Sequence, residues 1–214
     1  MDSTVSRQQL LQQGIRYEYF SIGWNIIEGC IAVGAGVMAG SVALTGFGID
    51  SFIETASAVV VCWRLSHERQ GCDGANVEQI ERRTARIAGV LLLGLAVYVA
   101  VESGRRLLGY GRPAEESLVG ITLTAVSAVV MPLLGMAKLQ TAKALNSGAL
   151  RADAYETITC AWLSLTTLAG LALNAGLGWW WADPAAGLVL VPLIVREGIE
   201  GLRGGCTCHS QCES

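Results

Sequence analysis

Hydrophobic residues gather in long blocks along this chain, and polar residues fill the shorter breaks between them. A transmembrane helix needs roughly 20 mostly apolar residues, and the blocks that meet this length predict six spans. The predicted spans cover residues 17–39, 42–65, 87–108, 118–139, 149–175 and 182–202. Only Gly40 and Ser41 separate the first two spans, which predicts a tight hairpin. We therefore expect an all-α membrane protein whose transmembrane domain, residues 17–202, is a six-helix bundle.

The placement of Lys and Arg predicts the orientation of the bundle, because positive residues concentrate in cytosolic loops. With six spans, both termini lie on the same side. That side holds twelve positive residues: Arg7, Arg16, Arg64, Arg69, Arg82, Arg83, Arg86, Lys138, Lys143, Arg151, Arg196 and Arg203. The opposite side holds Arg105, Arg106 and Arg112. We therefore expect both termini in the cytosol, residues 1–16 as an N-terminal arm, residues 203–214 as a cytosolic tail, and the bacterial cytoplasmic membrane as the location.

Composition narrows the class of protein further. Hydrophobic residues make up 52% of the chain and charged residues 15%, whereas soluble domains carry about 25% charged residues. The net charge of −3 gives no support for a nucleic-acid partner. Seven cysteines are present, an odd number, and three of them fall in apolar segments, which favours reduced thiols or metal ligands over a disulfide scaffold. No nucleophile–base pair or cofactor motif is present, so neither an enzyme nor a bound cofactor is expected.

Ionisable residues within the spans are the candidate functional groups, because such residues usually face the bundle interior or a water-filled path. Asp50 and Glu54 are four residues apart in the second span and therefore share one helix face. Glu156 and Cys160 repeat this spacing in the fifth span. The fourth and sixth spans carry no ionisable residue near their middles.

Three carboxylates and a thiolate form a suitable donor set for a divalent ion, and the sulfur favours Zn²⁺. Cd²⁺, Co²⁺, Mn²⁺ and Fe²⁺ are alternative candidates for the bound ion. When the ion leaves, the carboxylates would take up protons, which predicts a metal-for-proton exchanger. The alternative is a non-transporting membrane protein whose intramembrane polar residues mediate helix association or regulate a partner.

Further polar residues are candidates for a secondary metal site or an ion path. Asn25 and Glu28 of the first span either line the path or brace the second span, and Asp153 either attracts cations or caps a helix start. The tail is rich in soft-metal ligands: Cys206, Cys208, His209 and Cys212. Such tracts often bind metal, and the alternative is an unstructured tail with incidental thiols.

Three stretches resemble the cation diffusion facilitator family of divalent metal transporters. GSVALTGFGIDSFIETAS (40–57) is similar to the second helix of that family, RADAYETITCAWLS (151–164) to the fifth, and WADPAAGL (181–188) to the opening of the sixth. The resemblance implies a metal site at Asp50, Glu54, Glu156 and Cys160, and zinc efflux. Histidines common at these positions in the family are absent, which makes the carboxylates the expected proton carriers.

The resemblance also carries expectations about the assembly. The chain looks closest to the transmembrane-protein-163-like branch, a short form without the cytosolic C-terminal domain that is usual in the family. Because that domain normally contributes dimer contacts, we expect a homodimer held together by the transmembrane helices.

Overall fold

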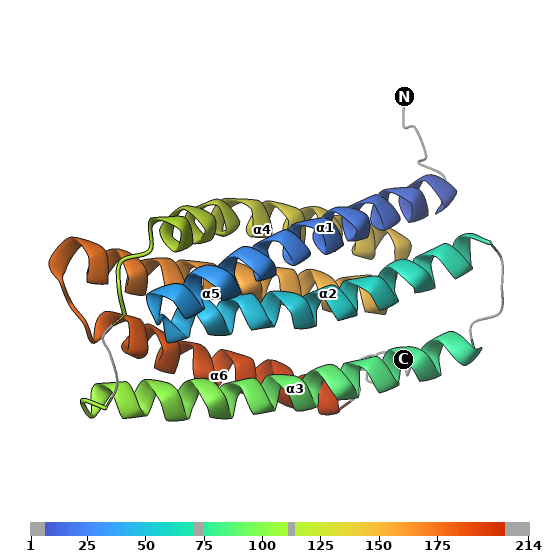
Figure 1. The fold of residues 1–214 in the computed structure, drawn as a ribbon. Coiled ribbons are helices and arrows are strands. Elements are labelled where there is room, and N and C mark those ends of the chain that lie inside the picture. Colours follow the sequence, from blue (N-terminus) through green and yellow to red (C-terminus); the bar gives the residue numbers. More distant parts are fainter. Residues whose placement is uncertain (1–6, 71–74, 111–113, 204–214) are drawn as a thin grey trace, which may run out of the picture.

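The computed structural model describes residues 7–70, 75–110 and 114–203, with side chains in the second range given at 83 and from 85 onward. Regular structure in these ranges is entirely helical. The helices are α1 (Arg7–Ala39), α2 (Val42–Arg69), α3 (Ala75–Leu107), α4 (Leu118–Leu145), α5 (Gly148–Leu177) and α6 (Ala182–Leu202). Successive helices run in opposite directions, so α1 begins and α6 ends at the same end of the bundle (Figure 1). The predicted all-α six-helix bundle is confirmed, while the side of the membrane on which this end lies stays a prediction.

Local chemistry explains where several helices begin and end. Ser41, Ser117 and Ser147 precede α2, α4 and α5, and each side chain accepts a hydrogen bond from the backbone N–H three residues later. Serine is a preferred residue at this capping position. Asn146 and Gly178 end α4 and α5 in the left-handed conformation, with φ of 53° and 64°, which is common at helix C-termini.

Five of the described helices are long and apolar enough to cross a membrane: α1, α2, residues 85–107 of α3, α4 and α5. α6, which does not meet this criterion, has 21 residues and carries Asp183 in its first turn and Arg196, Glu197 and Glu200 toward its end. The first helix is longer than its predicted span. Residues 7–16 of the predicted arm continue into it, and Leu11 and Ile15 are buried in a cluster with Leu65 and Leu150.

The helices pack as three close pairs, α1 with α2, α4 with α5, and α3 with α6. The α3–α6 pair lies along one side of the other four helices (Figure 1). α2 is the most central helix, because it contacts α1, α3, α5 and α6. Its approach to α1 requires a glycine: a Cβ added at Gly48 would lie 2.7 Å from the backbone nitrogen of Val33.

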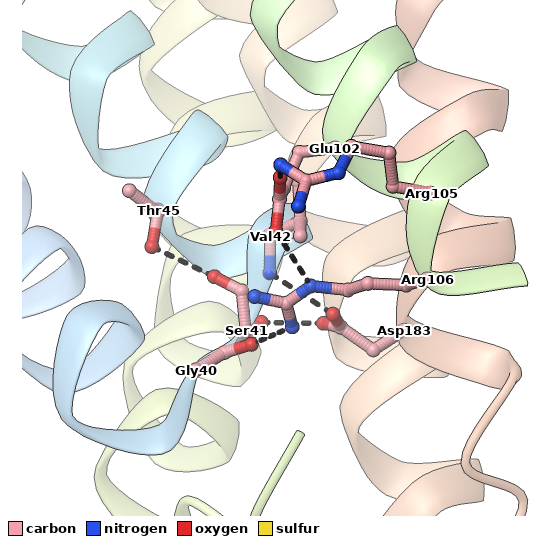
Figure 2. Close-up of polar contacts among 8 residues, drawn as sticks. All are labelled: Gly40, Ser41, Val42, Thr45, Glu102, Arg105, Arg106 and Asp183. Carbon is pink, nitrogen blue, oxygen red and sulfur yellow. Dashed lines mark hydrogen bonds and ion pairs between the residues drawn. The ribbon is translucent and has the colours of Figure 1, made fainter. Parts of the chain in front are cut away.

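A polar cluster, which we call the end clasp, joins three helices (Figure 2). It lies at the end of the bundle opposite the one where α1 begins and α6 ends. It comprises Asp183, Ser41, Val42, Arg106, Gly40 and Glu102. The Asp183 carboxylate accepts hydrogen bonds from the Ser41 hydroxyl and, at 3.0 Å, from the Val42 backbone N–H. The Arg106 guanidinium donates to the Gly40 carbonyl and, at 3.2 Å, to Glu102. The clasp thus ties the starts of α2 and α6 and the last turns of α3 to one another.

Candidate metal-binding site

The predicted ligands on α2 are both buried. Asp50 is 6% exposed and Glu54 is 7% exposed, as expected for two residues one turn apart on the inward face of a central helix. Neither carboxylate oxygen of Glu54 has a hydrogen-bond partner. Its polar neighbours from α5 are Thr157 and Cys160. A buried carboxylate thus faces the Thr157 hydroxyl and the Cys160 thiol of α5 without accepting a hydrogen bond from either of them.

The predicted ligands on α5 are not equivalent. Cys160 is buried as a free thiol, and Ser164 continues the same buried face. Glu156 is exposed at the surface of the isolated chain. Its neighbours are Ser57 and Glu54 of α2, and it also interacts electrostatically with Glu197 of α6. Glu156 therefore lies toward the edge where α2, α5 and α6 meet.

The four predicted ligands share one electrostatic neighbourhood. Cys160 interacts with Glu54 and Asp50, and Asp50 interacts with Glu54 and Glu156. Within the described ranges, however, no group of three or more His, Cys, Asp and Glu side chains is close enough to hold one ion. The fold brings the predicted ligands together without closing them around a single point, and their role as a metal site stays a prediction.

Glu28 of α1 belongs to the same neighbourhood, since it interacts electrostatically with Cys160 and Asp50. It is buried and accepts hydrogen bonds from three side chains: Ser51 at 3.1 Å, Trp24 at 3.3 Å, and Ser127. This network braces α1 against α2 and α4. Asn25 is also fully buried, and neither atom of its amide has a partner.

Two buried charged residues were missed by the sequence analysis, Lys138 of α4 and Glu18 of α1. The sequence analysis counted Lys138 only among the positive residues of the cytosolic side; in the structure its side chain is fully buried and pairs with Glu18 and Asp153. α4 continues to Leu145, so Lys138 lies about two turns inside it. Its place in the buried stripe of Ser127, Met131 and Leu134 was the available signal.

Buried polar side chains extend through the group formed by α1, α2, α4 and α5. We call the following set the polar column: Glu18, Ser21, Asn25, Glu28, Ser51, Thr124, Ser127, Lys138, Asp153, Thr157, Ser164 and Thr167. On α1 the spacing of three and four residues places all four members on one face. Buried polar groups are normally hydrogen-bonded, yet Ser21, Asn25 and Thr167 have side-chain atoms without partners. The polar column therefore has unused capacity to bind water, protons or cations.

The tail candidates Cys206, Cys208, His209 and Cys212 lie outside the described residues. Their predicted metal binding stays a prediction.

Residues 19–203 match the cation efflux transmembrane domain. An uncharacterized transporter of Synechocystis sp. is 29% identical over 175 residues, which are 80% of this chain and 56% of that protein. A cadmium, cobalt and zinc/H⁺–K⁺ antiporter of Bacillus velezensis is 25% identical over 180 residues, 82% of this chain and 55% of that protein. The cation-efflux pump FieF of Shewanella oneidensis is 23% identical over 173 residues, 78% of this chain and 56% of that protein.

The chain thus spans a little more than half the length of these relatives. The match to the transmembrane domain covers most of the chain and agrees with its bundle of apolar helices. The chain is an integral membrane protein that belongs to the cation efflux family.

Proposed function

We propose that this protein is a divalent cation transporter that exports Zn²⁺ in exchange for protons. Asp50, Glu54, Glu156 and Cys160 are its ion ligands, and the bacterial cytoplasmic membrane is its location. The family membership supports cation transport, and the Bacillus relative is named for cadmium, cobalt and zinc. The thiol of Cys160 favours Zn²⁺ or Cd²⁺ over an ion that takes only oxygen ligands, and Co²⁺, Mn²⁺ and Fe²⁺ are weaker candidates.

The observation that carries this proposal is the carboxylate of Glu54, which is buried beside Asp50 and accepts no hydrogen bond within the described part of the chain. Taking a charged group out of water costs several kcal/mol unless it is paired. Lys138 interacts with Glu54 electrostatically, but its ion pairs are with Glu18 and Asp153. A divalent ion between the helices would supply positive charge at the Glu54 carboxylate itself, and protons would neutralise the carboxylate after the ion leaves. Alternating access around this site would then exchange one ion for protons across the membrane.

The α2–α5 contact is where such a site can open and close. In the present arrangement the predicted ligands are neighbours but do not converge. A small shift of α5 toward α2 would bring Glu156 to the buried ligands on α2. We propose that ion binding selects this closed arrangement, and that two copies assemble through their transmembrane helices as a homodimer.

The test is Zn²⁺ transport into vesicles that contain the purified protein and a Zn²⁺-sensitive dye. Asp50→Asn and Cys160→Ser should each abolish transport and reduce Zn²⁺ binding measured by calorimetry. Glu200→Gln is the matched control, because Glu200 is exposed and pairs with Arg196 on the surface. Normal transport by the Asp50 and Cys160 variants would refute the central site. Transport that does not respond to an imposed pH gradient would refute proton exchange.

A further inference from the structure

The ammonium of Lys138 lies among oxygen atoms from two other helices. Asp153 Oδ2 is 2.5 Å from Lys138 Nζ, Glu18 Oε2 is 3.2 Å away, and Thr157 Oγ1 is 3.4 Å away. The side chains of Lys138, Glu18 and Asp153 are completely shielded from solvent. A cation is therefore held inside the bundle by oxygen atoms from α1 and α5. In this structure that cation is the ammonium of Lys138 from α4.

This oxygen cluster has more ligand capacity than the lysine uses. Glu18 Oε1 and Asp153 Oδ1 are buried and have no hydrogen-bond partner. Two carboxylates against one ammonium also leave the group with one net negative charge if all three are ionised. Buried ion pairs rarely stabilise a fold relative to apolar residues of similar size. Unused oxygens and excess negative charge are instead the properties of a site for a cation of higher charge.

The cluster lies next to the predicted metal ligands along α5. Thr157 is one turn before Cys160, and Asp153 is one turn before Glu156. Lys138 also interacts electrostatically with Glu54. Because α4 ends at Leu145 and α5 begins at Gly148, the cluster lies on the side of the predicted ligands nearer to the end of the bundle where α1 begins and α6 ends. An ion moving through the polar column between that end and Glu54 would meet this cluster.

We propose that the position of the Lys138 ammonium is a second cation site, formed by Glu18, Asp153 and Thr157. Lys138 occupies it as a tethered competitor, and a divalent cation takes its place when the lysine side chain withdraws. The donors are all oxygen, which suits Mn²⁺ as well as Zn²⁺ and sets this site apart from the thiol-containing one. The identification of the ion as the transported one rests on the proposed function; the existence of the site does not.

Competition between Lys138 and a divalent ion predicts that removing the lysine increases ion binding. A divalent ion and an ammonium cannot share these oxygens, because their like charges would repel one another at a few Å in a medium of low dielectric constant. Lys138→Met removes the competitor and leaves the oxygens in place. We expect this variant to bind one more Mn²⁺ per chain than the wild-type protein, with an apparent affinity for that ion at least about tenfold higher than the cluster shows in the wild type.

The experiment measures Mn²⁺ binding by equilibrium dialysis and electron paramagnetic resonance on purified full-length protein in detergent micelles. Lys138→Met is compared with the triple variant Lys138→Met, Glu18→Gln, Asp153→Asn, which lacks both carboxylates. Lys143→Met is the matched control, because Lys143 is exposed on the same helix. One additional ion in Lys138→Met that is lost in the triple variant supports the site. No additional ion in Lys138→Met, or one that persists in the triple variant, overturns it.

Two further comparisons keep the test decisive. If Lys138→Met aggregates in chelator, it is purified with Mn²⁺: recovery of monodisperse protein supports the site, and equal aggregation with and without Mn²⁺ overturns it. The measurement is also repeated in an Asp50→Asn background. The additional ion is expected there too, because its ligands do not include Asp50. Loss of the proposed transport function would therefore leave this result unchanged.

Discussion

Replacing Glu54 by Gln is expected to stabilise the ion-free protein and to abolish its stabilisation by Zn²⁺. Glu54 is buried in α2, and neither of its carboxylate oxygens accepts a hydrogen bond. A buried polar group without a partner costs about 1–3 kcal/mol, and more if it is charged. Gln keeps the shape of the side chain and removes the charge. The substitution therefore relieves the desolvation penalty of a buried charge and loses no hydrogen bond, while the interaction with Lys138 that it also removes offsets part of the gain.

The expected change in stability follows from the cost of burying an unpaired polar group and from the stabilisation by bound Zn²⁺. Because the Gln amide is itself left unpaired, we expect a net gain of about 1–2 kcal/mol, or roughly 2–8 °C in the melting temperature of a chain of this size. Zn²⁺ at about 100 times its dissociation constant stabilises a binding protein by about 2.7 kcal/mol. The order should therefore reverse: Glu54→Gln melts above the wild type in chelator and below it in saturating Zn²⁺.

Thermal unfolding in detergent micelles, followed by tryptophan fluorescence, measures the melting temperatures in chelator and in saturating Zn²⁺. The advantage of Gln in chelator should be larger at alkaline than at acidic pH, because the wild-type carboxylate is more fully ionised at alkaline pH. Glu102→Gln is the control with the opposite sign, since Glu102 pairs with Arg105 at 3.3 Å and with Arg106 at 3.2 Å. The reasoning is refuted if Glu54→Gln is less stable than the wild type in chelator, or if Zn²⁺ stabilises both proteins equally.

Three further substitutions test the packing and the end clasp. Gly48→Ala should destabilise the protein by about 1–3 kcal/mol through overpacking, because its Cβ would lie 2.7 Å from the Val33 nitrogen. Gly34→Ala has nothing within 4 Å of its Cβ and should be neutral or stabilising by up to about 1 kcal/mol; equal melting temperatures would contradict the close approach. Asp183→Asn should cost about 1.5–3 kcal/mol and speed hydrogen exchange at the Val42 amide. Unchanged exchange there would contradict the bond to that amide.

The sequence predicted the helices and the buried pair on α2 well, because both depend on local patterns. Apolar blocks identify spans, and a spacing of four residues places Asp50 and Glu54 on one face. Both side chains are buried in the structure. Glu156 and Cys160 have the same spacing but differ in exposure. That difference depends on which parts of the α5 surface are covered by α2 and α6. The spacing of residues along α5 gives no information about this packing.

Lys138 shows why the interior charges were harder to predict. A lysine near the end of an apolar block is typical of a cytosolic loop, and the positive-inside rule reinforces that interpretation. Its burial depends on Asp153, 15 residues away, and on Glu18, 120 residues away. Each residue alone favours a position at the membrane surface. Only the packing of α1, α4 and α5 makes the three of them a buried group.

The end clasp sets where the α3–α6 pair can pivot. It joins the start of α6 to the start of α2, and the last turns of α3 to the turn before α2 (Figure 2). If these bonds hold, the pair can tilt only about that end. α6 has 21 residues and is therefore about 30 Å long, so a tilt of about 10° would move its other end by roughly 5 Å, the rise of one helical turn. Fixing this end of the α3–α6 pair would concentrate any opening of the bundle at the other end, where α1 begins and where α6 carries Glu197 and ends.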